Sequence, residues 1–238
     1  MKPCAVQLII YLVLFLCPLS VMSQEKTLTV SQFNAVWIKA CEKTKHLPHR
    51  ETEKSEQYDG DSKPPYHTYI RVTRYIPTDR VWVIAGRKDS STEEKYEEIR
   101  IGAKSYSREG SNDWKLKELG FSGLYYCEPE EGADATVRRG ASIVSTDRSP
   151  GEIRFEFEYL YLGKKDSLDH YVRIKRMIVP LGGSESRTIF KYSYWINENG
   201  AFAKNESETR NLGTARWERQ VREFDYGVKD LTIEAPIK

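Results

Sequence analysis

Residues 152–161 carry the sequence EIRFEFEYLY, and this stretch decides the fold class. Ile153, Phe155 and Phe157 alternate with Arg and Glu, so one face of the segment is apolar and the other is charged. A period of two is typical of a β-strand with one buried and one solvated face. The segment is therefore predicted to be a strand whose apolar side packs into a core.

More alternating segments follow toward the C-terminus: Tyr171–Val179, Ile189–Ile196, Phe202–Glu208 and Trp217–Tyr226. Turn residues separate most of them. Asn199-Gly200 predicts a two-residue hairpin turn, because such a turn needs positive φ at both positions. Residues 150–236 are therefore predicted to form one antiparallel β-meander, with Phe202–Glu208 at a polar edge of the sheet.

The N-terminal half contains one predicted helix, Thr29–Thr44, in which apolar residues recur at spacings of three and four. Ser31 is its expected N-cap. The polar run His49–Lys63 is predicted to be a loop, since it ends in two prolines. Strands are expected at Tyr66–Ile76, Val81–Ala85, Glu97–Tyr106 and Trp114–Leu116, and a long loop at Glu118–Gly151.

The first 23 residues indicate export. An apolar run from Ala5 to Leu19 is shorter than the ~20 residues that cross a bilayer. Residues 1–23 are therefore predicted to be a cleaved signal peptide and residues 24–238 a single domain, with an uncleaved anchor as the alternative. The bulky residues before Cys17 fit a lipobox poorly, so no lipidation is expected there.

Two cysteines remain after cleavage, Cys41 and Cys127. In an oxidising compartment such a pair is the minimum for a disulfide, which would contribute roughly 4–5 kcal/mol in the loop-entropy model. The alternative is two buried thiols that pack as small hydrophobes. Both stay open, because the distance between the two Cα atoms decides between them.

Composition and motifs argue against several classes of function. The chain has 37 Lys and Arg against 35 Asp and Glu, and such a balance argues against a nucleic-acid partner. The sequence has no nucleophile elbow, phosphate-binding glycine loop or His-Glu-x-x-His motif, so we expect no catalytic residue, no enzyme activity and no cofactor. His46 and His49 lie near Cys41, but Pro48 interrupts them and a zinc site needs more ligands, so no metal site is expected.

The predicted meander also indicates a ligand surface. If the apolar positions of its strands share one face, they form a large dry surface beside the helix. The candidate ligand-binding residues are Trp37, Phe155, Phe157, Ile174, Tyr192 and Tyr194. Arg176 is unusual on such a face, and either meets a ligand head group or reaches solvent at the rim. The same aromatic residues form a filled core if the helix packs tightly on them.

Several segments carry a resemblance to a known family: Ile99–Tyr106 with Trp114, Tyr159–Gly163 with Asp169–Val172, Tyr194–Ile196 with Asn199-Gly200, and Phe224–Tyr226 with Ile233–Pro236. Their order and spacing resemble the LolA-like exported carriers, which include the mycobacterial lipid-binding lipoproteins LppX and LprG. The resemblance covers most of the chain after residue 24.

The resemblance implies a mainly β (α+β) fold: a single curved antiparallel sheet, or an incomplete β-barrel, with the N-terminal helix packed on its concave face. It implies non-covalent binding of a lipid or other apolar ligand on that face, and carriage between membranes. We expect an exported monomer, in the periplasm or outside the cell, that contacts a membrane only peripherally. The chain departs from the family in having one clear helix and an unusual segment at Glu118–Gly151, which is expected to act as a lid.

A second hypothesis keeps the fold but fills the core. An envelope interaction or sensor domain would hold no ligand and would bind an envelope protein through exposed side chains such as Trp195 or Trp217. A cavity on the sheet distinguishes the two hypotheses. Asn205-Glu206-Ser207 also matches the N-glycosylation acceptor pattern, which matters only in a eukaryotic host.

Overall fold

The computed structural model describes one sheet and one helix over most of the chain after residue 24. It describes residues 25–61, 63–77, 80–87, 95–118, 127, 154–181, 184–229 and 231–237. The predicted signal peptide at residues 1–23 lies outside these residues, as does the predicted lid apart from Glu118 and Cys127.

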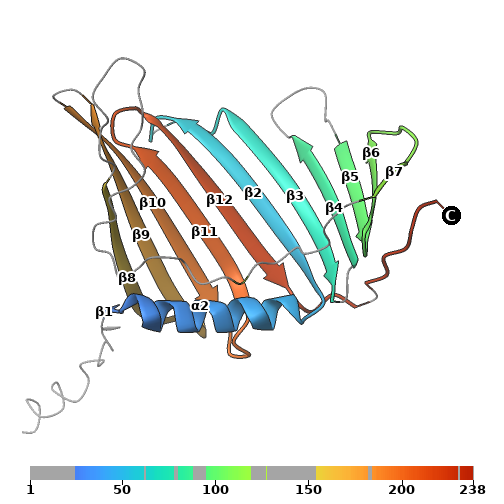
Figure 1. Ribbon diagram of the computed structural model, residues 1–238, viewed down its shortest axis with the longest axis horizontal. Coiled ribbons are helices and arrows are strands. Elements are labelled where there is room, and N and C mark those ends of the chain that lie inside the picture. Colours follow the sequence, from blue (N-terminus) through green and yellow to red (C-terminus); the bar gives the residue numbers. More distant parts are fainter. Residues whose placement is uncertain are drawn as a thin grey trace, which may run out of the picture.

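Within the described residues, twelve strands form one antiparallel sheet in the order β1-β8-β9-β10-β11-β12-β2-β3-β4-β5-β6-β7 (Figure 1). The strands are β1 (Lys26–Thr27), β2 (His49–Asp59), β3 (His67–Ile76), β4 (Arg80–Arg87), β5 (Lys95–Ile101), β6 (Lys104–Glu109), β7 (Lys115–Glu118), β8 (Arg154–Lys165), β9 (Leu168–Leu181), β10 (Ser184–Ile196), β11 (Phe202–Asn211) and β12 (Arg216–Asp225). The helix α2 (Val30–Lys45) crosses one end of the sheet (Figure 1). The sheet is curved and does not close, because β1 and β7 form its two edges.

The predicted C-terminal meander is confirmed, since β8 to β12 pair consecutively and antiparallel. The prediction that Phe202–Glu208 forms an edge is wrong, because β11 lies between β10 and β12. The sheet continues instead from β12 to β2, which joins the two ends of the chain. Alternation within a strand gives its two faces, whereas its position in the sheet depends on long-range pairing.

The tight turn predicted at Asn199-Gly200 is a longer loop. Strand β10 ends at Ile196 and β11 begins at Phe202, and Gly200 has a φ of 78° within that loop. A two-residue connection with positive φ at both positions occurs instead at Asp166-Ser167, with φ of 52° and 67°. Aspartate tolerates this left-handed conformation better than most residues, so the sequence signal was present there but weaker than Asn-Gly.

The predicted helix is confirmed, but its cap is Thr29 rather than Ser31. The backbone N–H of Gln32 donates to Oγ1 of Thr29 at 3.2 Å, and the N–H of Thr29 donates to Oε1 of Gln32 at 2.9 Å. This reciprocal pair is a capping box, which satisfies two N–H groups that the first turn otherwise leaves without partners. The cap therefore lies two residues before the position that the sequence predicted, and the helix spans Val30–Lys45.

The loop predicted at His49–Lys63 is wrong over most of its length, because β2 occupies His49–Asp59. This strand lacks an apolar face, since Glu51 and Glu53 point to one side and Lys54 and Glu56 to the other. A polar strand is stable here because β12 and β3 flank it and place arginines opposite its carboxylates. The strand predicted at Glu97–Tyr106 is two strands, since Gly102 turns the chain with a φ of 55°.

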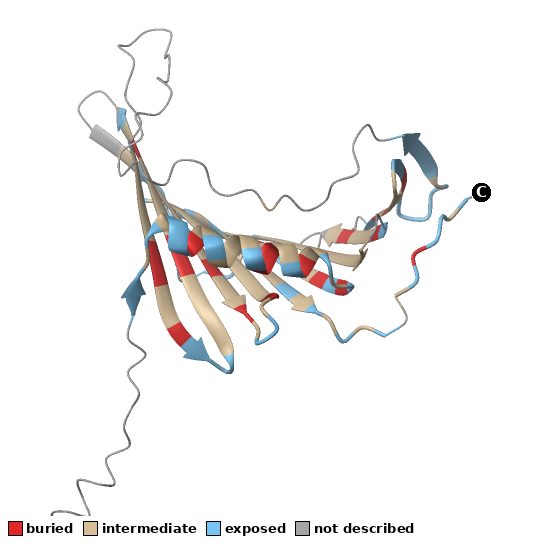
Figure 2. Cartoon of the chain, turned by 60° about the horizontal axis from the view of Figure 1, so that its bottom comes forward, coloured by how far each residue is buried: buried red, intermediate tan, exposed pale blue. Residues whose placement is uncertain are grey.

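The core has two parts. One lies where α2 crosses the sheet, and Figure 2 shows buried residues on the helix and on the strands beside it. Here Ala40 and Cys41 pack on Ile196 and Phe202. The other lies at the far end, where Ile233 of the C-terminal segment packs against Ile99 and Tyr106. Nη1 of Arg80 donates to the carbonyl of Ile233 at 2.8 Å, which holds the C-terminal segment against this end of the sheet.

Candidate ligand-binding site

One face of the sheet packs against α2, and we call it the helix-side face. Directly opposed residues of neighbouring strands share a face, so the register identifies its members. One row across the sheet runs Tyr159, Arg173, Tyr192, Ser207, Gln220, Ser55 and Tyr69. The next row, closer to α2, runs Tyr161, Tyr171, Tyr194, Asn205, Arg222, Glu53, Arg71 and Ala85.

The helix packs tightly on this face over β8 to β11. The ring of Phe33 lies 4.9 Å from that of Tyr159 and 5.9 Å from that of Tyr194, measured between centroids. The rings of Trp37 and Phe202 lie 6.5 Å apart. The space between these aromatic rings has no room for a water molecule. This part of the face is therefore a filled core.

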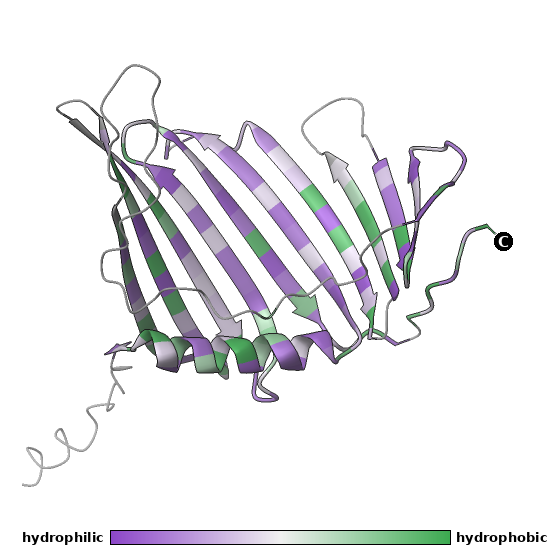
Figure 3. Cartoon of the chain, viewed as in Figure 1, coloured by the Kyte–Doolittle hydropathy of each residue, from purple (hydrophilic) through white to green (hydrophobic). Residues whose placement is uncertain are grey.

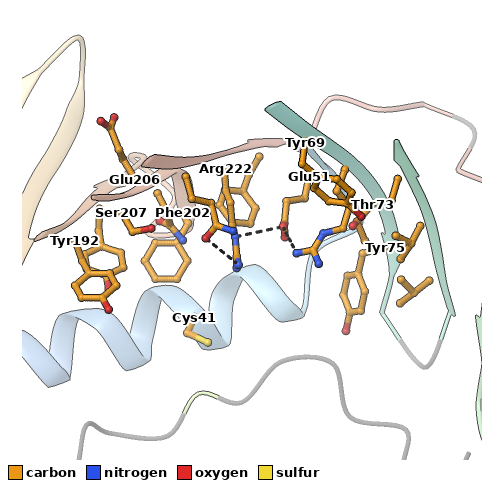
Figure 4. Close-up of a pocket in the computed structure, with 18 of the residues that line it drawn as sticks. Cys41, Glu51, Tyr69, Thr73, Tyr75, Tyr192, Phe202, Glu206, Ser207 and Arg222 are labelled. Atoms are coloured by element: carbon orange, nitrogen blue, oxygen red, sulfur yellow. Dashed lines mark hydrogen bonds and ion pairs between the residues drawn. The ribbon is translucent and has the colours of Figure 1, made fainter. Parts of the chain in front are cut away.

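A groove opens beside the helix on the same face, with a volume of about 700 Å³ (Figure 4). Its walls come from α2 and from strands β10, β11, β12, β2, β3, β4 and β5. Trp37, Tyr194, Phe202 and Phe224 give it an aromatic wall near the helix, and β4 adds aliphatic side chains. This volume lies within the range of about 300–1,000 Å³ that small-molecule sites occupy.

The floor of the groove carries paired charges. Glu53 is 4% exposed, and its Oε2 atom lies 2.6 Å from Nη2 of Arg71 and 2.7 Å from Nε of Arg222. Glu51 is 5% exposed, and its Oε1 atom lies 3.8 Å from Nε of Arg222 and 4.0 Å from Nη2 of Arg71. Two carboxylates and two guanidinium groups thus neutralise one another under the ligand space, and Figure 4 shows Glu51 and Arg222 of this group. The expectation of a dry face is wrong here: polar residues dominate β12 and β2 (Figure 3).

A second charge pair lies at the β5 end of the groove. Nε of Arg100 donates to Oε1 of Glu98 at 2.7 Å, and the hydroxyl of Ser105 donates to the same oxygen at 2.7 Å. Burial alone would raise the pKa of Glu98, but the hydrogen bonds from Arg100 and Ser105 outweigh it and lower the pKa below 4.5. Glu98 is therefore ionised at neutral pH and already has its partners.

Asn205 supplies a polar group that has no partner. Its Oδ1 atom is buried and accepts no hydrogen bond from any described residue, although the residue lines the groove. A buried amide oxygen without a donor is destabilising by roughly 1–3 kcal/mol, so a donor on a ligand would relieve this penalty. The same residue begins the glycosylation acceptor triplet, and it lies in the interior of β11 rather than in a surface loop.

The far part of the helix-side face, over β8 to β10, lies outside the groove and has different chemistry. Phe155 and Phe157 of β8 and Phe190 of β10 surround Lys175 of β9, whose Nζ atom lies 4.7, 5.9 and 5.8 Å from the three ring centroids, respectively. Next to it, the guanidinium of Arg173 lies 4.1 Å above the ring of Tyr192. Tyr192 also lines the groove, so the two parts of the face adjoin at this residue.

The structure divides the residues that the sequence proposed for ligand binding. Trp37, Tyr192 and Tyr194 line the groove. Phe155 and Phe157 lie on the same face but surround Lys175. These two groups adjoin at Tyr192, whereas the sixth residue, Ile174, lies apart from both.

Ile174 lies on the opposite face, and the expectation that it shares a face with Phe155 and Phe157 is wrong. It is directly opposed to Glu158, one position away from the Phe157–Lys175 pair. Alternation gives the two faces of each strand, but the register decides which faces of two strands coincide. Arg176 belongs to the face of Ile174, and its Nη2 donates to Oε2 of Glu158 at 3.0 Å. Arg176, which was unexpected on a dry face, therefore has a carboxylate partner on the opposite face of the sheet.

The sequence missed the charged floor of the groove. Glu51 and Glu53 fall in the run that was predicted to be a loop, and their partners Arg71 and Arg222 are distant in sequence. One signal was available: Glu51 and Glu53 lie two positions apart, a spacing that places both carboxylates on one face of a strand. The pairing of β2 with β12 has no local signal.

Trp195 and Trp217, which the interaction-domain hypothesis proposed as exposed, lie on the opposite face from the groove. The ring of Trp195 stacks on His170 at 4.4 Å, and Nζ of Lys204 lies 4.7 Å from its centroid. The ring of Trp217 stacks on Tyr58 at 3.9 Å, and the guanidinium of Arg210 lies 4.4 Å from its centroid. Both indoles are half-buried among neighbouring side chains rather than fully exposed.

Cys41 and Cys127 form a disulfide, with their Cα atoms 5.7 Å apart. Cys41 lies in α2 and also lines the groove. The bond joins residues 86 positions apart, for which the loop-entropy model gives about 4.5 kcal/mol. It ties the chain near residue 127 to the helix beside the groove.

Neither a metal site nor a membrane-spanning helix is found in the described part of the chain. No three His, Cys, Asp or Glu side chains gather there as ligands, and no helix there is both long and apolar enough to span a bilayer. His49 is fully buried against the rings of Tyr75, Phe224 and Tyr226. It belongs to the packing between β2, β3 and β12.

No protein-family model and no curated protein sequence matches this chain. Among solved structures, the chain is similar to LprF from Mycobacterium bovis, with 11% identity and a TM-score of 0.41 over 87% of this chain and 97% of that one. A DUF1329 family protein from Desulfovibrio piger has 10% identity and a TM-score of 0.32, over 86% of this chain and 95% of the other.

An outer membrane lipoprotein-sorting protein domain from Vibrio parahaemolyticus has 10% identity and a TM-score of 0.27, over 84% of this chain and 93% of that domain. LprF and the sorting domain are of the kind that the sequence resembles. At these identities and TM-scores the similarities carry no argument about what this chain binds.

Proposed function

We propose that this protein is an exported binding protein that holds a lipid or other apolar ligand non-covalently against the helix-side face. We take this face to be the concave side of the curved sheet. The observation that carries the proposal is the groove of about 700 Å³ between α2 and the sheet, with Trp37, Tyr194 and Phe202 along one wall. No covalent step and no cofactor is needed for such a role.

The polar floor is compatible with an apolar ligand because its charges are already paired. Glu53 lies within 2.7 Å of a guanidinium nitrogen on each side, so a hydrocarbon chain above it would not leave a carboxylate without a partner. Apolar surface removed from water against the aromatic wall contributes about 25 cal/mol per Å². Asn205 offers an acceptor for one polar group of the ligand.

The proposed setting is the cell envelope. The predicted signal peptide would deliver the chain to the periplasm or the exterior, and a monomer without a lipid anchor would diffuse between membranes as a carrier. Contact with a membrane would then be peripheral and would serve loading and release.

A second candidate function is an envelope interaction or sensor domain that binds no ligand. The observation that favours it is the filled contact between α2 and the aromatic residues of β8 to β11, which leaves no room for water. In this case the groove would hold only solvent, and an envelope protein would be the partner.

Native mass spectrometry of the mature protein, followed by organic extraction, tests the proposal. We expect a co-purifying lipid mass, or uptake of a fluorescent fatty acid by the lipid-free protein. Uptake should fall in Tyr192→Ala, which opens the groove wall, and stay unchanged in the matched control Ile174→Ala on the opposite face. A ligand-free mass together with no uptake would favour the interaction domain.

A further inference from the structure

Lys175 occupies an unusual environment on the helix-side face. The register places it directly opposite Phe157 on one side and Phe190 on the other. Its Nζ atom also lies 4.7 Å from the ring centroid of Phe155. A lysine ammonium usually reaches water or a carboxylate, whereas this one sits among three aromatic rings.

Among the residues that the structure describes, no carboxylate on this part of the face is close enough to pair with Lys175. Among the described helix-side positions of β8 to β11, the one acidic residue is Asp169 at the start of β9. Asp169 accepts a hydrogen bond from the hydroxyl of Tyr161 at 2.8 Å. It lies six residues before Lys175, about 20 Å along an extended strand, so it cannot pair with the ammonium.

The electrostatics agree with this geometry. Burial and, to a smaller extent, the charge of Arg173 lower the pKa of Lys175 below 10.5, and no acidic group raises it. Arg173 lies two positions away on the same face and is 7% exposed. The ammonium of Lys175 against aromatic rings creates a positive potential beside an apolar surface.

We propose that Lys175 binds the anionic group of an amphiphilic lipid, a carboxylate or a phosphate ester, whose hydrocarbon part lies on the helix-side face. The inference rests on the proposed function and names the ligand class for that site. An anion would supply the missing countercharge, and a charge-assisted hydrogen bond of this kind is among the stronger ones in proteins. The rings of Phe155, Phe157 and Phe190 would contact the adjoining methylene groups, which a free inorganic anion lacks.

The groove adjoins the group formed by Lys175 and the three phenylalanine rings around it. Tyr192 is directly opposed to Arg173 and also lines the groove, while Phe190 is its neighbour two positions earlier on the same face. A single chain anchored at Lys175 can therefore extend over Tyr192 toward the aromatic wall without leaving the face. The paired charges of the floor offer no such anchor, because their arginines already contact glutamates.

Three probes of matched tail length, dodecanoate, dodecyl phosphate and neutral dodecanol, test this assignment on the mature, lipid-free protein, together with inorganic phosphate, which has no tail. We expect the two anionic amphiphiles to bind about tenfold or more tightly than dodecanol, as one charge-assisted contact implies. Lys175→Met should abolish this preference while dodecanol binding persists. Lys191→Met is the matched control, since Lys191 lies on the opposite face of β10, and it should keep the preference.

The outcomes separate the two proposals. Equal binding of dodecanoate and dodecanol, or a preference that survives Lys175→Met, overturns the anionic anchor and leaves the apolar site standing. Binding of none of the amphiphiles overturns both. Binding of inorganic phosphate as tight as that of dodecyl phosphate overturns the lipid assignment in favour of a free anion. Circular dichroism and thermal melting of each variant show that the comparison is made between folded proteins.

Discussion

The helix-side face has two halves that differ in the partners of their charged side chains. Over β12, β2, β3 and β5, arginines are matched by carboxylates: Arg71 and Arg222 contact Glu53, and Arg100 contacts Glu98. Over β8 to β10, Lys175 and Arg173 lie on aromatic rings. In the first half the arginines are paired with carboxylates of the sheet, whereas in the second the ammonium of Lys175 lies among aromatic rings.

The difference shows how each half contributes to the protein. Matched buried pairs fix the register between β12, β2 and β3, because removing one partner leaves a charge without its countercharge. The cation over the aromatic rings contributes little to folding, since its desolvation opposes its attraction to the rings. We therefore expect substitutions in the first half to change stability and substitutions in the second to change binding.

Glu53→Gln should have the largest effect on stability. It leaves Arg71 and Arg222 facing an amide, and we expect a loss of about 2 kcal/mol in the free energy of unfolding, reduced from the value for fully buried pairs because both arginines are partly exposed. Urea denaturation measures this loss. Glu223→Gln on the opposite face of β12 is the control, and a loss equal to that of Glu53→Gln would contradict the distinction between the faces.

Glu98→Gln should cost about 1 kcal/mol, because two hydrogen bonds to an ionised carboxylate become weaker. It should also change the acid limb of the stability curve. The pKa of Glu98 is lowered from 4.5 in the folded protein, so its contribution is present above pH 4.5 and is lost as the pH falls through the folded value. A variant whose acid sensitivity matches that of the wild type would show that this pair does not act as described.

Lys175→Met should change the free energy of unfolding by no more than about 0.5 kcal/mol, and a gain in stability is as consistent with our account as no change. A loss of 2 kcal/mol would mean that the cation is part of the core and would remove the contrast between the halves.

The ammonium of Lys175 should titrate below 10.5 when followed by side-chain NMR, because burial disfavours its charged form. Its contribution to stability should therefore rise as the pH approaches 10.5, since the unfolded chain binds the proton more strongly there. The difference between wild type and Lys175→Met isolates this term from the tyrosines that titrate at similar pH.

Thr188→Glu would place a carboxylate beside Lys175, so that this cation would have an acidic partner like the arginines of the other half. Thr188 lies on the helix-side face diagonal to Lys175, where side chains about 7–8 Å apart still interact. We expect a stability change of only a few tenths of a kcal/mol, a raised pKa for Lys175, and weaker binding of dodecanoate with dodecanol unaffected. An unchanged affinity for dodecanoate would count against Lys175 as its anchor.

The sequence predicted most individual elements correctly. The helix and the C-terminal strands have periods that depend only on local backbone geometry, and they are where the alternation placed them. It failed at β2, because a strand in mid-sheet with charges on both faces has no apolar period to detect. It also failed at Ile174, since no local pattern gives the phase between two strands.

The site was predicted only in part. Trp37, Tyr192 and Tyr194 were identified as aromatic residues on a predicted helix and a predicted strand, and they line the groove. Lys175 and the four charged residues of the groove floor were missed, because a charged residue in a strand is read as solvated unless its neighbours on adjacent strands are known. Those neighbours come from strands up to 171 residues apart, as with Glu51 and Arg222.

By itself, the sequence determined most of the strands other than β2, the helical character of Thr29–Thr44, and the apolar sides of the first strands of the meander. The tertiary structure alone decided that β12 pairs with β2, that Lys175 lies among phenylalanines while Arg71 and Arg222 meet glutamates, and that a groove remains beside the helix. The physical reason is the sequence separation over which each property is set. Alternation follows from the φ and ψ of neighbouring residues, whereas charge matching and cavities depend on pairing between distant strands.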